Sequence, residues 1–297
     1  MNTDGDGCMN TLRKIKTIRQ EWEAVKKESR VFINQTEARQ SSVKFAEAYK
    51  RQKVNENKIL YESYWGRGMI DNPYAIFLEL MSRDKYQKFT HIWVLDDFEK
   101  NGPVLQKYQN NPQVQFVLFG SQEYLNALAS AKYLINNTTF PHYFVKKQKQ
   151  IYMNTWHGTP LKSMGYDVPD GSSSSANTIR NFLHADYLLS ANKLMTKMYL
   201  KSYKLEGILP GQIIEEGQPR NDLLVRGEKE PVYEKLRQYG ISIEKEKKII
   251  LYAPTWREAR EGGLKIHADE LIHVKEKLEE NLDTNEYQIL IKPHQYV

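Results

Sequence analysis

Residues 151–162 read IYMNTWHGTPLK, and the character of this segment changes half-way along. Ile151–Asn154 is a short apolar and aromatic run of the kind that forms a buried β-strand. The run leads directly to His157 and Gly158, and Pro160 follows. Glycine permits a close approach of backbone or ligand, and proline stops the strand and allows a helix to begin nearby. The segment therefore predicts a strand whose end carries a histidine.

Short strand-like runs alternate with helical segments on both sides of this motif, from residue 58 onward. This repetition is typical of parallel sheets with helices on both faces, and the handedness of the crossovers then gives Rossmann-like units. The sequence therefore predicts an α/β fold. We expect strands at Ile59–Tyr64, His91–Leu95, Val114–Phe119, Tyr133–Asn136, Ile151–Asn154, Tyr187–Ser190, Lys248–Ala253 and Tyr287–Lys292, and helices at Pro73–Arg83, Gln122–Ala131, Leu194–Tyr203 and Asp269–Leu282.

Changes in composition predict two Rossmann-like domains joined by a linker. The N-terminal domain is expected at 58–225 and the linker, which begins RGEKEP, at 226–245. Residues 246–297 contain only two expected strands and one helix, fewer than an open α/β sheet usually has. We therefore expect a partial C-terminal domain, in a chain that is truncated at its C-terminal end. Residues 171–177, GSSSSAN, are expected to form a mobile loop.

The first part of the chain, residues 1–57, is charged and has no strand-like run. Its apolar residues recur at helical spacing between basic residues, which predicts a basic amphipathic helix. Such a helix either lies on anionic lipid or packs on the body of the protein or on a partner helix, and packing is the commoner arrangement. The apolar positions are Ile15, Ile18, Trp22, Val25 and Phe32.

The balance of charge favours anionic partners. The 297 residues carry a formal net charge of +6, which suits nucleic acid, phosphorylated small molecules or an anionic membrane surface without choosing among them. Cys8 is the single cysteine, which excludes an internal disulfide and a cysteine-type zinc site. We therefore expect an intracellular protein. We expect no signal peptide and no membrane-spanning run, and any membrane contact is expected to be peripheral. No Walker loop or G-x-G-x-x-G follows a strand, so ATPase and NAD-binding fingerprints are lacking.

Two further strand ends carry polar side chains. Residues 253–258 read APTWRE, and the Arg257 guanidinium is suited to phosphate, although an ion pair with a nearby glutamate is the alternative. Residues 291–294 read IKPH, which places Lys292 and His294 after the last expected strand, where a merely polar loop is the alternative. Ligands bind outside the carboxyl ends of strands in open α/β sheets. Both segments are therefore candidate ligand-binding positions.

Each signal alone is weak, and a structural histidine satisfied by backbone groups is the alternative for His157. Together, the two histidines, Arg257, Lys162 and Lys292 predict one cleft between the two domains, suited to a diphosphate and a hydroxyl acceptor. An imidazole can act as a general base near pH 7, and His157 is expected to take the proton of the attacking hydroxyl. His294 and Arg257 would hold the diphosphate, because phosphoryl transfer depends mainly on positioning and on stabilisation of the anion.

The segment GQPRND at 217–222 lies just before the expected linker. Glycine and proline fix a turn there. Arg220 and Asp222 are expected either to bridge the two domains or to contact ligand, and we favour the bridging role.

At these residues the sequence resembles the CDP-glycerol glycerophosphotransferases that build teichoic acid and related capsule chains. The resemblance covers roughly residues 58–297, and YESYWGRGMIDNP at 61–73 is similar to the first strand and loop of that family. The motifs that carry it are NTWHGTPLK (154–162), GQPRNDL (217–223), ILYAPTWR (250–257) and IKPH (291–294).

The resemblance implies a GT-B fold with its active site between two Rossmann-like domains, the first for the acceptor and the second for the CDP donor. It implies transfer of glycerol phosphate or ribitol phosphate from CDP-glycerol or CDP-ribitol to a lipid-linked polymer, with release of CMP. It assigns His157 as the base and implies peripheral attachment to the cytoplasmic face of the membrane, without a nucleic-acid partner. His294 is then expected to be catalytic beside His157, in contact with the donor phosphate. The donor-binding residues are expected to be Arg257, Thr255, Lys292, Gly158 and Thr159.

The family continues beyond the KPH motif with an acidic, Ser-rich element that helps hold the nucleotide, so cytidine recognition by this chain is expected to be incomplete. No dedicated metal site is expected, although a divalent cation can accompany the diphosphate. Two alternatives stay open: a GT-B glycosyltransferase that uses a nucleotide sugar, and an inactive truncated remnant.

Overall fold

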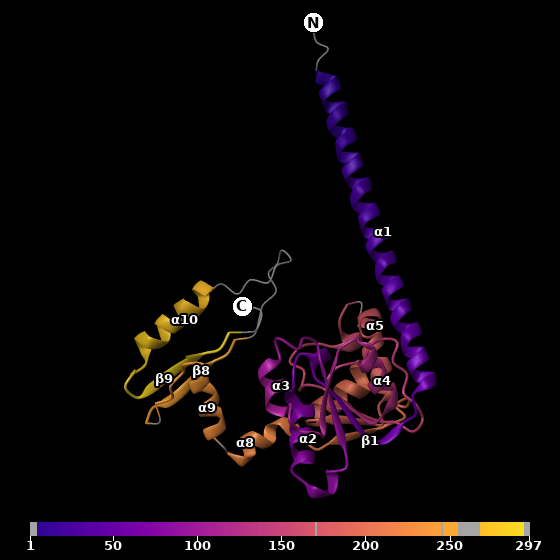
Figure 1. Cartoon of the computed structure of the whole chain (residues 1–297). Coiled ribbons are helices and arrows are strands. Elements are labelled where there is room, and N and C mark those ends of the chain that lie inside the picture. Colours follow the sequence, from indigo (N-terminus) through magenta and orange to yellow (C-terminus); the bar gives the residue numbers. More distant parts are fainter. Residues whose placement is uncertain (1–4, 170, 228, 245, 255–267, 294–297) are drawn as a thin grey trace. The chain divides into compact units, whose positions relative to one another are not determined.

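The computed structural model describes residues 5–169, 171–227, 229–244, 246–254 and 268–293. The chain divides into two compact units, Met1–Val225 and Arg226–Val297, each of which is described by itself (Figure 1).

The first unit is built on a seven-stranded, fully parallel sheet with the order β3-β2-β1-β4-β5-β6-β7. The order 3-2-1-4-5-6 is that of the Rossmann fold, and here one further strand extends it. The predicted α/β class with a parallel sheet is thus confirmed. The strands are β1 (Asn55–Glu62), β2 (Thr90–Leu95), β3 (Val114–Leu118), β4 (Ala131–Asn136), β5 (Ile151–Asn154), β6 (Tyr187–Ser190) and β7 (Gln212–Glu215).

Helices cover both faces of this sheet because its strands are apolar on both sides. In β1, Leu60 belongs to one buried cluster, whereas Ile59 and Tyr61 belong to the other. The end of α1, together with α4, α6 and α7, packs on the first face, and α2 and α3 pack on the second. The helices are α1 (Gly5–Arg51), α2 (Asp71–Met81), α3 (Gly102–Tyr108), α4 (Gln122–Ser130), α5 (Gly171–Ser174), α6 (Ala176–His184), α7 (Lys193–Lys197) and α8 (Asp222–Arg226).

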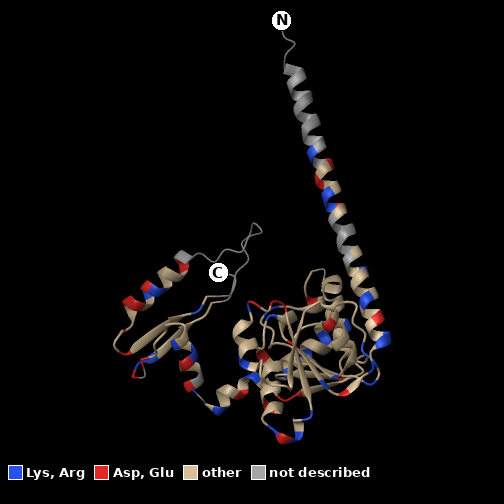
Figure 2. Cartoon of the chain, in the orientation of Figure 1, with Lys and Arg blue, Asp and Glu red and all other residues tan. Residues whose placement is uncertain are grey.

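Helix α1 is 47 residues long, and among its described side chains the buried ones lie at its C-terminal end. Phe45 and Ala48 are buried there, on the side of α4. Further toward the N-terminus, Trp22 and Val25 are 60% and 53% exposed. They are the two residues of the expected apolar stripe whose side chains are described. Figure 2 shows acidic and basic residues together along this stretch, where Lys26 pairs with Glu23 at 2.9 Å.

The second unit contains a pair of parallel strands, β8 (Lys248–Tyr252) and β9 (Tyr287–Ile291), with α10 (Ala268–Asn281) between them in sequence. Helix α9 (Glu230–Gln238) occupies much of the segment that the sequence suggested as a linker. This unit therefore has the strand–helix–strand order expected for it.

Three local expectations need correction. Residues 171–177 are not a loop: Gly171 opens the helical turn α5 and is buried, and a Cβ on it would lie 1.8 Å from the Gly165 oxygen. The helix expected at Leu194–Tyr203 begins as α7 and continues as a π-helical turn at Met198–Ser202. Tyr64 is not in a strand but in a short 3₁₀ turn, with φ +46°.

Candidate active site

The candidate site lies where the strand order of the sheet reverses. Strands β1 and β4 are neighbours at this point, and Glu62 pairs with Asn136 at their carboxyl ends. Ligands of doubly wound sheets bind in the crevice that opens at such a switch point. The segments that leave β1, β4 and β5 carry Tyr64, Asn137 and His157 respectively.

Asn154, the last residue of β5, fixes the path of the chain into the histidine motif. Its side-chain amide donates to the Thr138 oxygen at 2.7 Å and to Asn136 Oδ1 at 3.0 Å, and its Oδ1 accepts from the Trp156 N–H at 2.9 Å. Trp156 adopts φ +48°, in the left-handed region that is costly for a bulky residue. These hydrogen bonds hold a sharp turn that directs His157 out of the strand.

The imidazole of His157 is oriented by a backbone carbonyl. Nδ1 lies 2.8 Å from the Asn137 oxygen. A carbonyl oxygen only accepts hydrogen bonds, so Nδ1 carries the proton and Nε2 of the neutral ring has a free lone pair. The ring stacks on Trp156 at 4.3 Å between centroids, and the Tyr64 ring lies 5.7 Å away.

Burial lowers the pKa of His157, and the hydrogen bond to Asn137 and the charge of Asp71 oppose this effect only in part. The lowered pKa favours the neutral ring near pH 7, and a neutral ring with a free Nε2 can accept a proton.

Arg220 connects the histidine segment to the segment that precedes α2. Its Nη1 donates to the His157 backbone oxygen and to Asp71 Oδ2, each at 2.8 Å. The Asp71 side chain is 7% exposed and also accepts a 2.6 Å hydrogen bond from the Tyr64 hydroxyl. Burial and this bond raise the pKa of Tyr64, which keeps the phenol protonated. Arg220 therefore neutralises a buried carboxylate and holds the backbone that carries His157.

A second set of hydrogen bonds joins the same segments through Asn72. Its Nδ2 donates to the Trp156 oxygen at 3.2 Å and to Gln218 Oε1, and its Oδ1 accepts from the Arg220 N–H at 3.2 Å. Asn72 is fully buried. The motif GQPRND thus contacts the histidine motif directly within the first unit.

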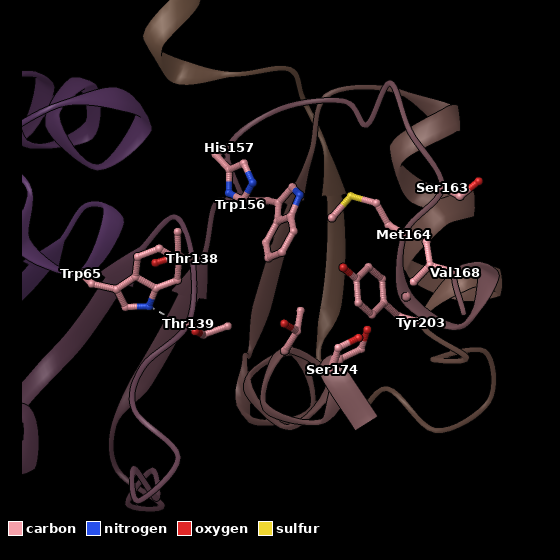
Figure 3. A pocket seen from close by; sticks show the side chains of 13 residues that line it. Trp65, Thr138, Thr139, Trp156, His157, Ser163, Met164, Val168, Ser174 and Tyr203 are labelled. Carbon is pink, nitrogen blue, oxygen red and sulfur yellow. Dashed lines mark hydrogen bonds between the residues drawn. The ribbon is translucent and has the colours of Figure 1, made fainter. Parts of the chain in front are cut away.

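A cavity of about 350 Å³ lies beside these groups (Figure 3). Figure 3 shows the rings of Trp65, Trp156 and Tyr203 around it, with His157 at one edge and Ser174 below. Its lining combines aromatic and hydroxyl-bearing side chains. The lining residues are Trp65, Thr138, Thr139, Trp156, His157, Ser163, Met164, Gly165, Val168, Ser174, Ser175, Thr178 and Tyr203.

The other expected site residues are distributed over both units. Gly158 has φ +143°, and Thr159 Oγ1 accepts a 2.8 Å hydrogen bond from the Asn192 side chain. Lys162 and Asp222 are exposed in the first unit, and Lys292 is exposed after β9 in the second. Thr255, Arg257 and His294 lie outside the described residues. The structure therefore brings His157, Gly158 and Arg220 together.

No role was predicted for Asn137, Asp71 or Asn72 from the sequence. Asp71 and Asn72 lie in YESYWGRGMIDNP, which resembles the first strand and loop of the family. That resemblance is the signal in the sequence that could have identified them. Within the described residues, no group of three or more His, Cys, Asp or Glu side chains could hold a metal ion. No helix in the same part of the chain is long and apolar enough to span a membrane.

Comparison with known proteins gives the family. The model of the CDP-Glycerol:Poly(glycerophosphate) glycerophosphotransferase family matches residues 44–297, so the chain belongs to this family. A teichoic acid poly(glycerol phosphate) polymerase of Bacillus spizizenii is 33% identical over 251 residues, which are 82% of this chain and 60% of that protein. A teichoic acid glycerol-phosphate transferase of Staphylococcus aureus is 32% identical over 254 residues, 82% of this chain and 61% of that protein.

Solved structures of the wall teichoic acid polymerase TagF are similar to the whole chain. One TagF variant gives a TM-score of 0.68 at 25% identity, over 99% of this chain and 66% of that chain. Another, soaked with CDPG for 30 minutes, gives 0.67 at 26% identity, over 99% of this chain and 65% of that one. This likeness confirms the expected GT-B-like class. The chain spans about 60% of the length of the two curated relatives above.

Proposed function

We propose that this chain takes part in the transfer of glycerol phosphate, or ribitol phosphate, from a CDP-activated donor to the end of a teichoic-acid or capsule polymer. A hydroxyl oxygen of the acceptor attacks the phosphorus that bears the polyol. A new P–O bond forms, the P–O bond of the diphosphate bridge breaks, and CMP leaves. The proton of the attacking hydroxyl passes to Nε2 of His157.

The geometry of His157 is the observation that carries this proposal. Its Nδ1 donates to the Asn137 oxygen at 2.8 Å, which fixes the tautomer, and its lowered pKa favours the neutral ring. Nε2 is therefore free to accept a proton. A group placed in this way can act as a general base, which typically contributes 10²–10⁴-fold to a rate. Membership of the family supplies the substrate class.

The donor side of the proposal rests on the second unit. Thr255, Arg257, Lys292 and His294 are proposed to bind the donor, with the two strand-end segments of that unit supplying cations to the diphosphate. Gly158 and Thr159 of the first unit are also proposed donor-binding residues, and this unit is proposed to be the acceptor domain. A divalent cation on the diphosphate is compatible with this arrangement.

Release of CMP from CDP-glycerol, measured with a glycerol-phosphate acceptor, tests the proposal. His157→Ala is expected to lower the rate by at least about 100-fold because the base is lost. His142→Ala is the matched control, since His142 is exposed and does not line the cavity. A His157→Ala protein that turns over like wild type refutes the assignment of the base. Sugar transfer from UDP-sugars without polyol-phosphate transfer would instead identify a glycosyltransferase.

Contact with an anionic membrane surface through α1 is part of the proposal. Trp22 and Val25 are exposed near Lys26 and Lys27, and this combination suits a peripheral helix on anionic lipid. A lipid-linked acceptor would then be reached at the cytoplasmic face of the membrane.

Sedimentation with vesicles tests this contact. Lys26→Glu/Lys27→Glu is expected to reduce binding to phosphatidylglycerol vesicles, whereas Lys275→Glu/Lys277→Glu on α10 serves as a charge-matched control. Equal binding of both double variants and of wild type would remove the membrane contact from the proposal.

A further inference from the structure

The cavity beside His157 has a lining without formal charge. Its walls are aromatic rings, hydroxyl groups, the histidine and the apolar side chains of Met164 and Val168, and none of its lining residues is Lys, Arg, Asp or Glu. Aromatic faces and hydroxyl partners suit a neutral, hydroxylated group, since C–H surfaces pack on the rings and the hydroxyls exchange hydrogen bonds. A phosphate would find no cation in this lining. The cavity therefore suits the polyol part of a substrate rather than its phosphate.

One buried hydroxyl in this lining has no hydrogen-bond partner among the described residues. Thr138 is 3% exposed, and among the described residues its Oγ1 makes no hydrogen bond. An unsatisfied buried hydroxyl costs about 1–3 kcal/mol, so such groups usually have a partner outside the chain, a water or a ligand. Trp65, which lines the same cavity, is 44% exposed and has φ +58°. A partly exposed aromatic residue held in a strained backbone conformation is typical of a binding site.

A second cavity of about 340 Å³ adjoins the first and is basic. The two share Ser163 and Met164. The charged residues that line the second are Lys162, Lys197, Lys201 and Asp167, three cations and one anion, which gives a formal charge of +2. Lys201 also pairs with Glu206, and the Asp167 carboxylate accepts a hydrogen bond from Ser202. The second cavity thus suits an anionic group.

We propose that the two adjoining cavities form the acceptor subsite of this enzyme. The terminal polyol unit of the acceptor lies in the neutral cavity, with its free hydroxyl at His157 Nε2 and another hydroxyl on Thr138. The phosphate that links this unit to the next one lies in the basic cavity near Lys197. The alternation of a neutral and a cationic cavity matches the alternation of polyol and phosphate in the polymer. This inference rests on the proposed function, because it assumes that the acceptor is a polyol phosphate.

Direct binding of a soluble acceptor tests the subsite separately from catalysis. A short glycerol-phosphate oligomer is titrated calorimetrically into the whole chain in the absence of CDP-glycerol. Lys197→Ala removes a cation from the basic cavity, and Thr138→Val removes the buried hydroxyl while keeping the shape of the side chain. Lys193→Ala is the control, since Lys193 is exposed on the same helix and lines neither cavity.

Lys197→Ala is expected to raise the dissociation constant of the oligomer by up to about five-fold, the effect of one exposed charge pair. Thr138→Val is expected to raise it by about two- to ten-fold, the effect of one neutral hydrogen bond. Lys193→Ala leaves it unchanged. Unchanged oligomer binding by Lys197→Ala and Thr138→Val overturns the subsite, as does a wild-type chain that binds no oligomer.

Kinetic measurements keep the subsite distinct from the proposed function. The two cavity variants should raise KM for the acceptor and leave KM for CDP-glycerol unchanged. If KM for CDP-glycerol rose instead, the cavities would be assigned to the donor. This result would refute the acceptor subsite and leave the proposed function intact. If the wild-type chain bound the oligomer but transferred nothing from CDP-glycerol, the proposed function would be refuted and the subsite would still stand.

Discussion

Glu62 offers a sharp test of the electrostatics at the switch point of the sheet. This last residue of β1 is fully buried, and its Oε2 accepts a hydrogen bond from the Tyr124 hydroxyl at 2.9 Å. Its Oε1 has no hydrogen-bond partner in the described part of the chain. Burial raises the pKa of Glu62 to about 8, and the bond from Tyr124 opposes this only in part. The side chain is therefore neutral in the folded protein at pH 7.

This shift makes the protein less stable as the pH rises. Between 4.5, the ordinary pKa of the group, and about 8, the folded state keeps a proton that the unfolded chain has lost. The free energy of unfolding should therefore fall by up to about 1.4 kcal/mol per pH unit in this window, and by roughly 3 kcal/mol between pH 4.5 and pH 7. Gln has no proton to lose, and its amide oxygen can still accept the hydrogen bond from Tyr124. Glu62→Gln should therefore remove this dependence.

Urea unfolding at pH 5, 6, 7 and 8, followed by tryptophan fluorescence, measures the effect. The quantity to compare is the difference in unfolding free energy between Glu62→Gln and wild type, because every other titrating group is common to both proteins. This difference should grow in favour of the variant as the pH rises. A difference that stays constant from pH 5 to pH 8 would show that Glu62 is ionised in the fold, and the reasoning from burial would be refuted.

Three further predictions concern the site and its supports. Arg220→Lys keeps the charge but cannot reproduce the hydrogen bonds of the guanidinium, so the rate of CMP release should fall by about ten-fold or more. The free energy of unfolding, measured in urea, should fall by only about 1–2 kcal/mol, because the Arg220 side chain is 36% exposed. Gly165→Ala should destabilise the protein far more than Gly120→Ala. Both glycines have positive φ, but of the two only Gly165 would place a Cβ against a neighbour, the Ser202 oxygen at 2.4 Å. Equal urea midpoints for the two variants would contradict this. The acid limb of the pH profile of the transfer rate should lie below pH 6.5, because the lowered pKa of His157 keeps this base neutral as the pH falls toward 6.5. An acid limb above pH 6.5 would contradict the assignment of His157 as the base.

The strands of the sheet could be predicted where an apolar run has clear boundaries in the sequence. Ile151–Asn154 was predicted to the residue, because an apolar run stands between a basic segment and a His-Gly-Thr-Pro turn. Strand β7 was missed, since this short edge strand begins with Gln212 and ends with Glu215. Helix α6 was missed because it follows a run of serines, which favour loops when read locally, although Phe182 buries it against the core.

The position of His157 just after a strand was predictable from the sequence, but its surroundings were not. A histidine at the end of a strand can be found by its position, because the topology of the sheet dictates where strand ends gather. Its hydrogen-bond partner is the backbone oxygen of Asn137, and a backbone acceptor leaves no mark in the sequence. The ion pair between Arg220 and Asp71 joins residues 149 positions apart, and no local pattern indicates which acid a given arginine meets.

Backbone strain gives an independent reason to place function at this end of the sheet. Among the described residues, five non-glycine residues have positive φ, and four of them, Tyr64, Trp65, Asp71 and Trp156, lie in the segments around His157. Each such conformation costs about 1–3 kcal/mol and persists only when its surroundings fix it. Here the ion pair between Arg220 and Asp71 and the asparagine hydrogen bonds do so. If the strain were incidental to folding, it would be spread over the unit rather than gathered around one imidazole.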